Sequence, residues 1–205
     1  SLWRVPYLLI DPKDIGRNYE AIIRINSQSG KGGVAYVLSR EHGFDLPKAM
    51  HIEVGNRIND YADRMQRELT AQEIYGFFLR NFVEKTEPLE LLDEDVHRVS
   101  KTSERPEYRC VAEVRHHGEV TQIEGIGNGP INAFVHAMDK QGWKHFHLTD
   151  FRQHALGGGS ATDSAAYVQL TREDGFATYG CGVDSNIETA GLKALVCAYN
   201  RLQED

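Results

Sequence analysis

The sequence is poor in cysteine, methionine and tryptophan, and it has no long apolar run. Its three cysteines, Cys110, Cys181 and Cys197, are widely spaced and form no Cys-x-x-Cys motif, which favours reduced structural thiols over a disulfide framework. No apolar run approaches the roughly 20 residues that a membrane-spanning helix needs, so no membrane partner is expected. The start of the chain lacks the basic and apolar regions of a signal peptide, and we expect a cytoplasmic protein.

Basic residues are also outnumbered. The formal net charge is −7, from 23 Lys and Arg against 30 Asp and Glu, and no polybasic tract is present. Because nucleic-acid backbones are bound by concentrated positive charge, a nucleic-acid partner is not expected. The chain has 205 residues, of which 40% are hydrophobic, so it can form one large domain or two small ones around a buried core.

The first part of the chain combines an extended segment with helical patterns. The apolar run of residues 3–10 is interrupted by Pro6, which favours an ordered extended segment that packs on something else. Residues 19–25 are rich in β-forming side chains and fit either a strand or the end of a short helix. The run from Val34 then predicts a helix that stops at Gly43.

A glycine-rich run at residues 27–33 invites comparison with a phosphate-binding loop. That motif needs a Ser or Thr after its lysine to hold magnesium, whereas Gly32 follows Lys31 here. We therefore expect a serine cap at the start of the following helix. A nucleotide-dependent catalytic domain is disfavoured for the same reason.

Two further helices are predicted between residues 46 and 83. A capping box at Thr70 and Glu73 marks the start of the second, ahead of an aromatic stripe that we assign to the core. The first is predicted because apolar residues recur every three or four positions after Asp45 and Pro47, at Leu46, Met50, Val54, Ile58, Ala62 and Met65.

Six acidic residues against one lysine, with Pro88 among them, occupy residues 84–95. We interpret this stretch as a solvated linker and place a domain boundary in it, between residues 1–86 and 87–205. The first domain is then a small, mostly helical linker module, with an extended segment and about three helices.

The second domain contains strand patterns. From Tyr108 the hydrophobic period changes to two, which predicts a hairpin that turns at His117 and Gly118. A glycine-rich turn follows, and then a helix beginning near Ile131.

The second domain also repeats itself at an offset of 57 residues. Gly118 matches Gly175, Gly125 matches Gly182, and the strand before them aligns Val111 with Val168. We therefore predict two copies of one unit, at about 108–140 and 165–205, with an extra strand at residues 145–148 before the second. The expected fold class is α+β, with two pseudo-twofold-related β-β-(β)-α repeats after the helical module.

The turn at residues 125–133 is the candidate binding site. Its glycines let a ligand approach the backbone, and the helix that follows directs free N–H groups toward a small anion. The second copy has Asp184, Ser185 and Asn186 at the same place, where an aspartate would cap the helix and repel a carboxylate. If the domain binds a small carboxylate, we expect it in the first copy only. The glycine-rich loop of residues 154–163 has the composition either of a loop that closes over a ligand or of a hairpin connection.

No other chemistry stands out. His145 and His147 would share one strand face, but a zinc site needs three convergent ligands, so no metal site is predicted. No nucleophile and base pair, and no pair of carboxylates in a pocket setting, suggests catalysis.

Over essentially its whole length the chain resembles the C-terminal part of 2-isopropylmalate synthase, in the long form of that enzyme. Residues 3–8, 10–12 and 19–33 are similar to the linker subdomains of the family, and the last of these runs is highly specific. The segments 127–130, 153–155 and 200–201 are similar to its regulatory domain.

The resemblance implies a regulatory role without catalysis. The catalytic (β/α)₈ barrel of the family, with its divalent metal and its sites for acetyl-CoA and the 2-oxo acid, would lie upstream of Ser1. This chain is then inactive alone and holds no cofactor. The resemblance further implies that leucine, the end product of the pathway, inhibits the barrel by binding the regulatory domain at a homodimer interface.

The resemblance also assigns roles to residues. Tyr7 matches a linker tyrosine that leans over the active site of the partner, which is an accessory catalytic role in the full enzyme. Related synthases sense isoleucine with similar domains, and a separate amino-acid-binding module acting on another subunit is a further alternative. The leucine site implied by the family comprises Gly127, Asn128, Gly129, Pro130, Ile131, Phe151, His154, Ala155, Ala161 and Thr162.

Overall fold

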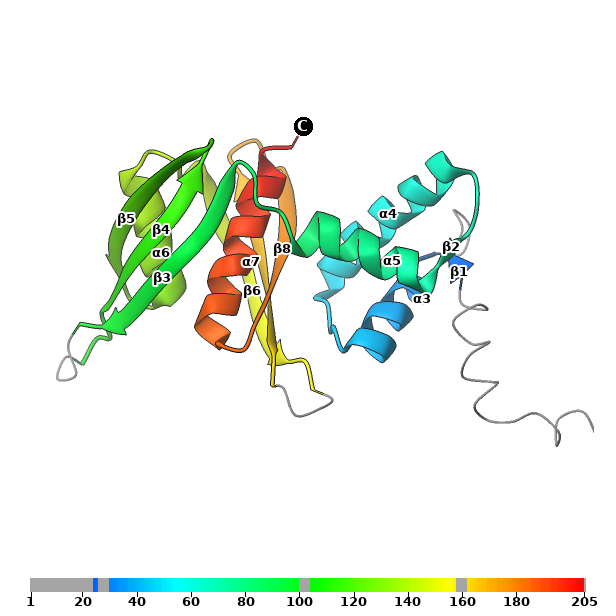
Figure 1. Cartoon of the computed structure of the whole chain (residues 1–205), viewed down its shortest axis with the longest axis horizontal. Helices are drawn as coiled ribbons and strands as arrows, with labels where there is room; N and C mark the ends of the chain where they lie inside the picture. The colour runs from blue at the N-terminus through cyan, green and yellow to red at the C-terminus, as the bar shows by residue number, and fades with distance from the viewer. Residues whose placement is uncertain (1–23, 26–29, 100–103, 158–161, 205) are drawn as a thin grey trace, which may run out of the picture.

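The computed structural model describes residues 24–25, 30–99, 104–157 and 162–204, which form a helical module beside two sheets (Figure 1). The described part therefore has the predicted α+β class, with a mostly helical region first and a repeated sheet-and-helix unit after it. Within these ranges no helix is both long and apolar enough to cross a membrane.

The helical module begins with a short strand, β1 (Arg24–Ile25), and the helix α3 (Gly30–Tyr36), which continues as the π-helical turn η2 (Val37–Glu41). Gly43 follows with φ +77°, a left-handed conformation that glycine adopts without strain. This confirms the predicted helix end.

The next helix, α4 (Lys48–Met65), starts after Pro47 as predicted. Its residues Met50, Val54, Ile58 and Ala62 are all buried, so most of the apolar face identified from their spacing is the face that packs. Met65, the last position predicted on that face, ends the helix and is 43% exposed.

Thr70 and Glu73 form the predicted capping box at the start of α5 (Ala71–Phe78), just after the short strand β2 (Leu69–Thr70). The Glu73 amide donates to Thr70 Oγ1 at 3.1 Å, and the Thr70 amide donates to Glu73 Oε1 at 3.2 Å. The chain continues as a second π-helical segment, η3 (Leu79–Val83), and the aromatic stripe lies in the core as expected.

Two three-stranded antiparallel sheets follow, each with one helix behind it. The first has the order β3-β4-β5, with bounds Leu89–Arg98, Tyr108–His116 and Glu119–Gly127, and is followed by α6 (Pro130–Lys140). The second has the order β6-β7-β8, with bounds Phe146–Ala155, Ser164–Arg172 and Ala177–Asp184, and is followed by α7 (Ile187–Leu202). The predicted internal repeat is therefore present.

The first strand of each repeat corrects the sequence analysis. The strand β6 has its counterpart, 57 residues earlier, in β3, which occupies most of the stretch that we predicted to be an acidic linker. Composition misled the prediction because β3 is an edge strand with four carboxylates, of which Asp93 and Asp95 are exposed and none is buried, and charge on an edge strand is common. The extra strand therefore belongs to both repeats.

The predicted alignment of Val111 with Val168 is wrong by one residue. Ala112 pairs with Glu94, and Val168 pairs with Phe151, the residue 57 positions after Glu94, so Ala112 and Val168 are equivalent. The shift is absorbed in the hairpin turns. The first turn closes from His116 to Glu119, whereas the second runs longer, from Thr171 to Ala177.

The second sheet is covered on both faces. Alternate residues of β7, Ala166, Val168 and Leu170, join the core shared by α6, α7 and the first sheet. Their neighbours Ala165 and Tyr167 face the opposite way, into the core of the helical module. The second repeat is thus held between its own helix and the helical module.

A buried ion pair joins the helical module to α7. Arg201 is 5% exposed, and its guanidinium contacts Glu53 of α4, with Nη2 3.1 Å from Glu53 Oε1. Its Nε donates to Thr178 Oγ1 at 3.2 Å, and its charge lies 3.7 Å from the centroid of the Phe82 ring. Arg201 therefore ties four elements together, namely α4, η3, β8 and α7.

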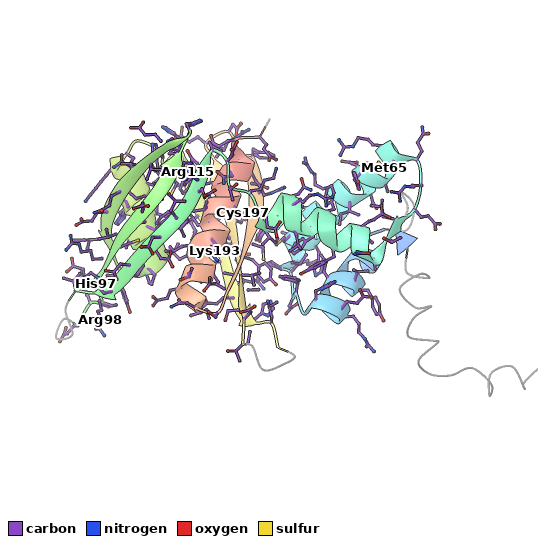
Figure 2. All side chains as sticks on the ribbon, viewed as in Figure 1. Met65, His97, Arg98, Arg115, Lys193 and Cys197 are labelled. Atoms are coloured by element: carbon purple, nitrogen blue, oxygen red, sulfur yellow. The ribbon has the colours of Figure 1, made fainter. Side chains whose placement is uncertain are left out.

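The three cysteines are buried and form no disulfide, as the sequence predicted. Cys197 lies on α7, where Figure 2 labels it above Lys193, and its thiol contacts the Phe82 carbonyl at 3.0 Å. Burial raises the pKa of Cys197 to about 11 and that of Cys110 to about 12. Both thiols are therefore protonated at neutral pH and act as packing groups.

Candidate functional site

A hollow of about 520 Å³ lies where the first turn of α6 faces the edge strand β6. It therefore lies between the two repeats, and its volume is in the range of small-molecule sites. Five of the predicted residues line it, namely Asn128, Gly129, Pro130, Ile131 and Phe151. Five residues that were not predicted line it as well, namely Asn132, Val135, Lys144, His147 and Leu148.

The entrance of α6 is uncapped. Gly129 is its N-cap and has no side chain to accept the first N–H groups, and Pro130 occupies the first turn. The Asn128 amide instead donates to Asn132 Oδ1 at 3.1 Å, which holds the loop against the helix. A helix start of this kind offers N–H groups and partial positive charge to an anion.

The entrance of α7 is closed by its own side chains. Asn186 Oδ1 accepts from the amides of Glu188 at 2.9 Å and Thr189 at 3.1 Å. The predicted difference between the repeats is therefore real, but the capping residue is Asn186 rather than Asp184. Asp184 accepts from the Asn186 amide and forms an ion pair with Lys193 at 2.8 Å.

Two glycines of the turn have a different role from the one predicted. A Cβ at Gly127 would lie 2.6 Å from the Ala133 amide nitrogen, and a Cβ at Gly125 would overlap the backbone of Ala133 and Ala137. Both glycines therefore let β5 approach α6 closely, and Gly127 does not line the hollow. The close approach that we predicted for a ligand is therefore made by the backbone of α6.

The apolar wall of the hollow depends on a β-bulge. Leu148 pairs with Leu170 and Phe151 pairs with Val168, with the register shifting at Thr149 between them. Residues three apart on a regular strand point to opposite faces, but the bulge returns Leu148 and Phe151 to the same face. Both are partly exposed, at 42% and 37%, so this edge presents apolar surface.

The hollow is lined by two basic residues, Lys144 and His147, and by no acidic residue. Lys144 is half-buried and lies just before β6, and His147 lies in that strand. Together with the open helix entrance, they make the hollow suited to a carboxylate. The sequence analysis placed His147 on a strand face, but nothing in the pattern singled out Lys144.

Other predicted residues lie elsewhere. His154 Nε2 is 2.7 Å from the Tyr167 hydroxyl and 3.3 Å from the Asp45 amide, so it joins β6 to the helical module rather than lining the hollow. Its neighbour Ala155 ends β6 and pairs with Ser164. Thr162 is exposed and outside the hollow, and Tyr7 and Ala161 lie outside the described residues.

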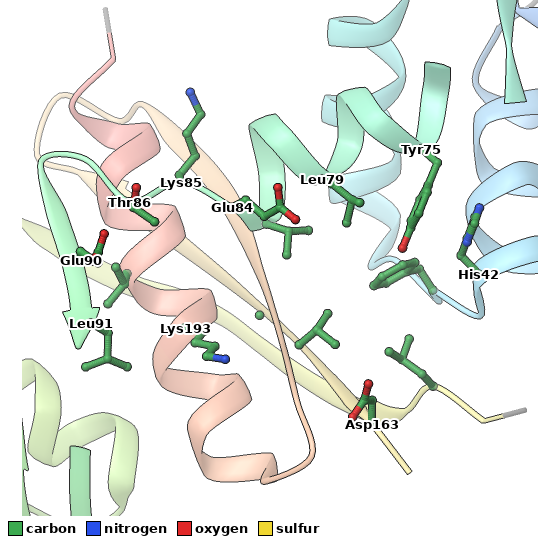
Figure 3. A pocket seen from close by; sticks show the side chains of 16 residues that line it. His42, Tyr75, Leu79, Glu84, Lys85, Thr86, Glu90, Leu91, Asp163 and Lys193 are labelled. Atoms are coloured by element: carbon green, nitrogen blue, oxygen red, sulfur yellow. The ribbon is translucent and has the colours of Figure 1, made fainter. Parts of the chain in front are cut away.

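A second hollow, of about 550 Å³, lies between the helical module and α7 (Figure 3). Rings of His42 and Tyr75 stack at one end, with centroids 3.5 Å apart, and Lys193 projects from α7. Two charged residues of its lining form ion pairs with neighbours at 2.8 Å, Lys193 with Asp184 and Glu90 with Arg115. It contains none of the ten residues of the implied leucine site. Leu156 and Asp163, from the glycine-rich loop that could close over a ligand at the α6 entrance, line this hollow and not the first one.

Among the residues that the structure describes, no group of three or more His, Cys, Asp or Glu side chains is placed to hold a metal ion.

Two family models match this chain. Residues 68–203 match the family model described as the LeuA allosteric (dimerisation) domain, and residues 1–39 match the one described as alpha-isopropylmalate synthase, post-catalytic domain-like. The first match covers the end of the helical module and both repeats.

Several curated relatives are named 2-isopropylmalate synthase. The Thermobifida fusca protein is 45% identical over 206 residues, covering 98% of this chain and 34% of that protein. The Clostridium acetobutylicum protein is 42% identical over 200 residues, covering 97% and 36%, and the Mycobacterium leprae protein is 39% identical over 200 residues, covering 98% and 32%. The chain therefore spans about a third of the length of the relatives it matches. With two repeats that match a single family model from end to end, the chain belongs to the family of LeuA allosteric (dimerisation) domains of 2-isopropylmalate synthase.

Proposed function

We propose that the chain is the regulatory part of a 2-isopropylmalate synthase and binds leucine as a feedback inhibitor in the hollow between α6 and β6. The observation that carries the proposal is the difference between the two helix entrances. The α6 entrance is uncapped and opens on an apolar wall, whereas the α7 entrance is closed by Asn186. One carboxylate site per chain follows.

Each part of leucine has a counterpart in the lining. Its carboxylate would accept from the first N–H groups of α6, with Lys144 adding positive charge and His147 a ring nitrogen at the lining. Its isobutyl group would pack on Ile131 and Phe151. The side-chain oxygens of Asn128 and Asn132 are the polar groups available for its ammonium, since no carboxylate lines the hollow.

We further propose that the hollow lies at a homodimer interface. Leu148 and Phe151 leave apolar surface at its mouth, at 42% and 37% exposure, and a second copy of the chain would cover that surface. The family description as a dimerisation domain supports this arrangement.

The reaction itself would take place outside this chain. The proposed enzyme is a cytoplasmic acyltransferase of leucine biosynthesis that condenses acetyl-CoA with 3-methyl-2-oxobutanoate to give 2-isopropylmalate. Its metal-dependent barrel would belong to the remainder of the synthase, and this chain alone would be inactive. Residues 1–86 would act as the linker, with Tyr7 as an accessory catalytic residue, and residues 87–205 as the regulatory domain.

Calorimetric titration of the chain with leucine, isoleucine and valine tests the proposal. Leucine should give saturable binding heat that is stronger than that of the other two. Preference for isoleucine would instead identify the regulatory domain of a related synthase. Absence of binding by all three at millimolar concentration would refute an amino-acid site.

A substitution at Gly129 tests the location of the site. A Cβ built there meets no atom within 4 Å, and the φ angle of −164° suits any residue. Gly129→Val should therefore leave the fold intact while placing a branched side chain across the helix entrance. We expect at least a tenfold loss of leucine affinity, from the lost contact of backbone and carboxylate. Unchanged affinity would move the site away from α6.

A further inference from the structure

Gly191 lies inside the 16-residue helix α7 and is buried. A glycine within a helix destabilises it relative to alanine, because the unfolded backbone of glycine is more flexible. A buried glycine there indicates that another group needs the space in which a side chain would stand.

The groups that need this space belong to the wall of the hollow. A Cβ at Gly191 would lie 3.0 Å from Ile131 Cδ1 and 3.5 Å from Phe151 Cε2. The first distance is shorter than ordinary carbon–carbon contact, so Ile131 would have to move. Gly191 itself does not line the hollow and stands behind these two side chains.

The first repeat shows the opposite choice of residue. The position 57 residues before Gly191 is Phe134, which is fully buried in the core. The counterpart of the α6–β6 hollow is the contact between the start of α7 and β3, where Thr189 Oγ1 donates to Glu94 Oε1 at 2.7 Å. Thus Phe134 on α6 accompanies the closed entrance of α7, whereas Gly191 on α7 accompanies the open hollow at the entrance of α6.

We propose that Gly191 sets the depth of the hollow and thereby selects an aliphatic 2-amino acid with the side-chain length of leucine. This inference rests on the proposed function, since it concerns the same site. The missing Cβ lets Ile131 and Phe151 lie back against α7. A methyl group at residue 191 displaces Ile131 toward the ligand and shortens the space for the end of the side chain.

Calorimetric titration of the Gly191→Ala variant with leucine and valine tests this role. Leucine affinity should fall about tenfold or more, while valine, which is one methylene shorter, should change less than threefold. The thermal midpoint should not fall, because alanine favours the helix and the contacted atom is the end of a flexible side chain. Equal losses for both ligands would indicate general damage and overturn the proposal.

Gly76→Ala is the matched control. Gly76 is also inside a helix, and its built Cβ meets only the end of the Arg80 side chain, at 3.1 Å. It should leave both affinities unchanged, and a tenfold change there would overturn the explanation through the hollow.

A second substitution provides a rescue test. Ile131→Val removes the Cδ1 atom that lies 3.0 Å from the new methyl group. Added to Gly191→Ala, it should restore most of the leucine affinity. Failure to do so, or a Gly191→Ala variant with leucine preference within twofold of the parent, overturns the role of Gly191. If the parent chain binds no leucine, the proposed function fails instead, so the two failures are distinguishable.

Discussion

The Arg201→Met substitution gives the most direct test of how the helical module is held. It removes a guanidinium that is 5% exposed and leaves the Glu53 carboxylate, whose side chain is 22% exposed, without its ion-pair partner. Loss of one member of a buried pair costs about 3–5 kcal/mol, because the remaining charge is desolvated without compensation. The lost contact with the Phe82 ring, at 3.7 Å, adds about 1 kcal/mol or less, so we expect about 4 kcal/mol.

Urea unfolding followed by circular dichroism measures this free energy directly. A surface pair supplies the control, because Arg67 Nη2 lies 2.6 Å from Glu73 Oε2 although the side chains are 47% and 30% exposed. Arg67→Met should cost much less than Arg201→Met, since solvent screens the pair.

The two outcomes separate burial from distance. The exposed pair is the shorter one, at 2.6 Å against 3.1 Å, so an explanation based on distance alone predicts the larger loss at Arg67. If Arg201→Met costs less than about 1 kcal/mol, the buried network does not hold the two regions together. In that case the stability losses of Arg201→Met and Glu53→Gln should add up in the double variant. We expect instead that the two losses are strongly coupled, because the residues form one ion pair.

Two further predictions concern stability. The hydrogen bond from Arg67 lowers the pKa of Glu73 from 4.5 to about 2. The contribution of Glu73 to stability is therefore present above about pH 4.5 and is lost as the pH falls through about 2. The difference in unfolding free energy between the parent and Glu73→Gln should shrink over that interval, and a constant difference would contradict the assignment. Gly125→Ala should destabilise by about 3 kcal/mol, since its Cβ meets backbone atoms that cannot turn aside, whereas Gly129→Ala should cost about 1 kcal/mol or less in the same urea assay; equal losses would refute the close approach of β5 and α6.

Local signals in the sequence were sufficient for many elements. The capping box at Thr70, the apolar spacing along α4 and the turn at His117 each depend on neighbouring residues, and all three are present. The 57-residue repeat was also visible, because glycines that admit a close helix recur in both copies. Composition failed for β3, where carboxylates on an edge strand resembled a linker.

The candidate site divides in the same way. The residues from Asn128 to Ile131 are contiguous, so their place at the helix entrance followed from the order of the sequence. Phe151 came from the family resemblance, and the structure brings it to the same hollow. Lys144 was missed, and His154 was placed in the wrong surroundings, because each depends on how a distant element packs.

The sequence by itself determined the helices, the repeat and the uncapped entrance of α6, since these depend on side chains a few positions apart or on matching residues. Only the tertiary structure decided which surface faces that entrance. The bulge at Thr149 turns Leu148 and Phe151 to one face, and the absent side chain of Gly191 leaves room behind Ile131. Both effects arise where segments distant in the chain come into contact, because strand register and helix packing set these positions.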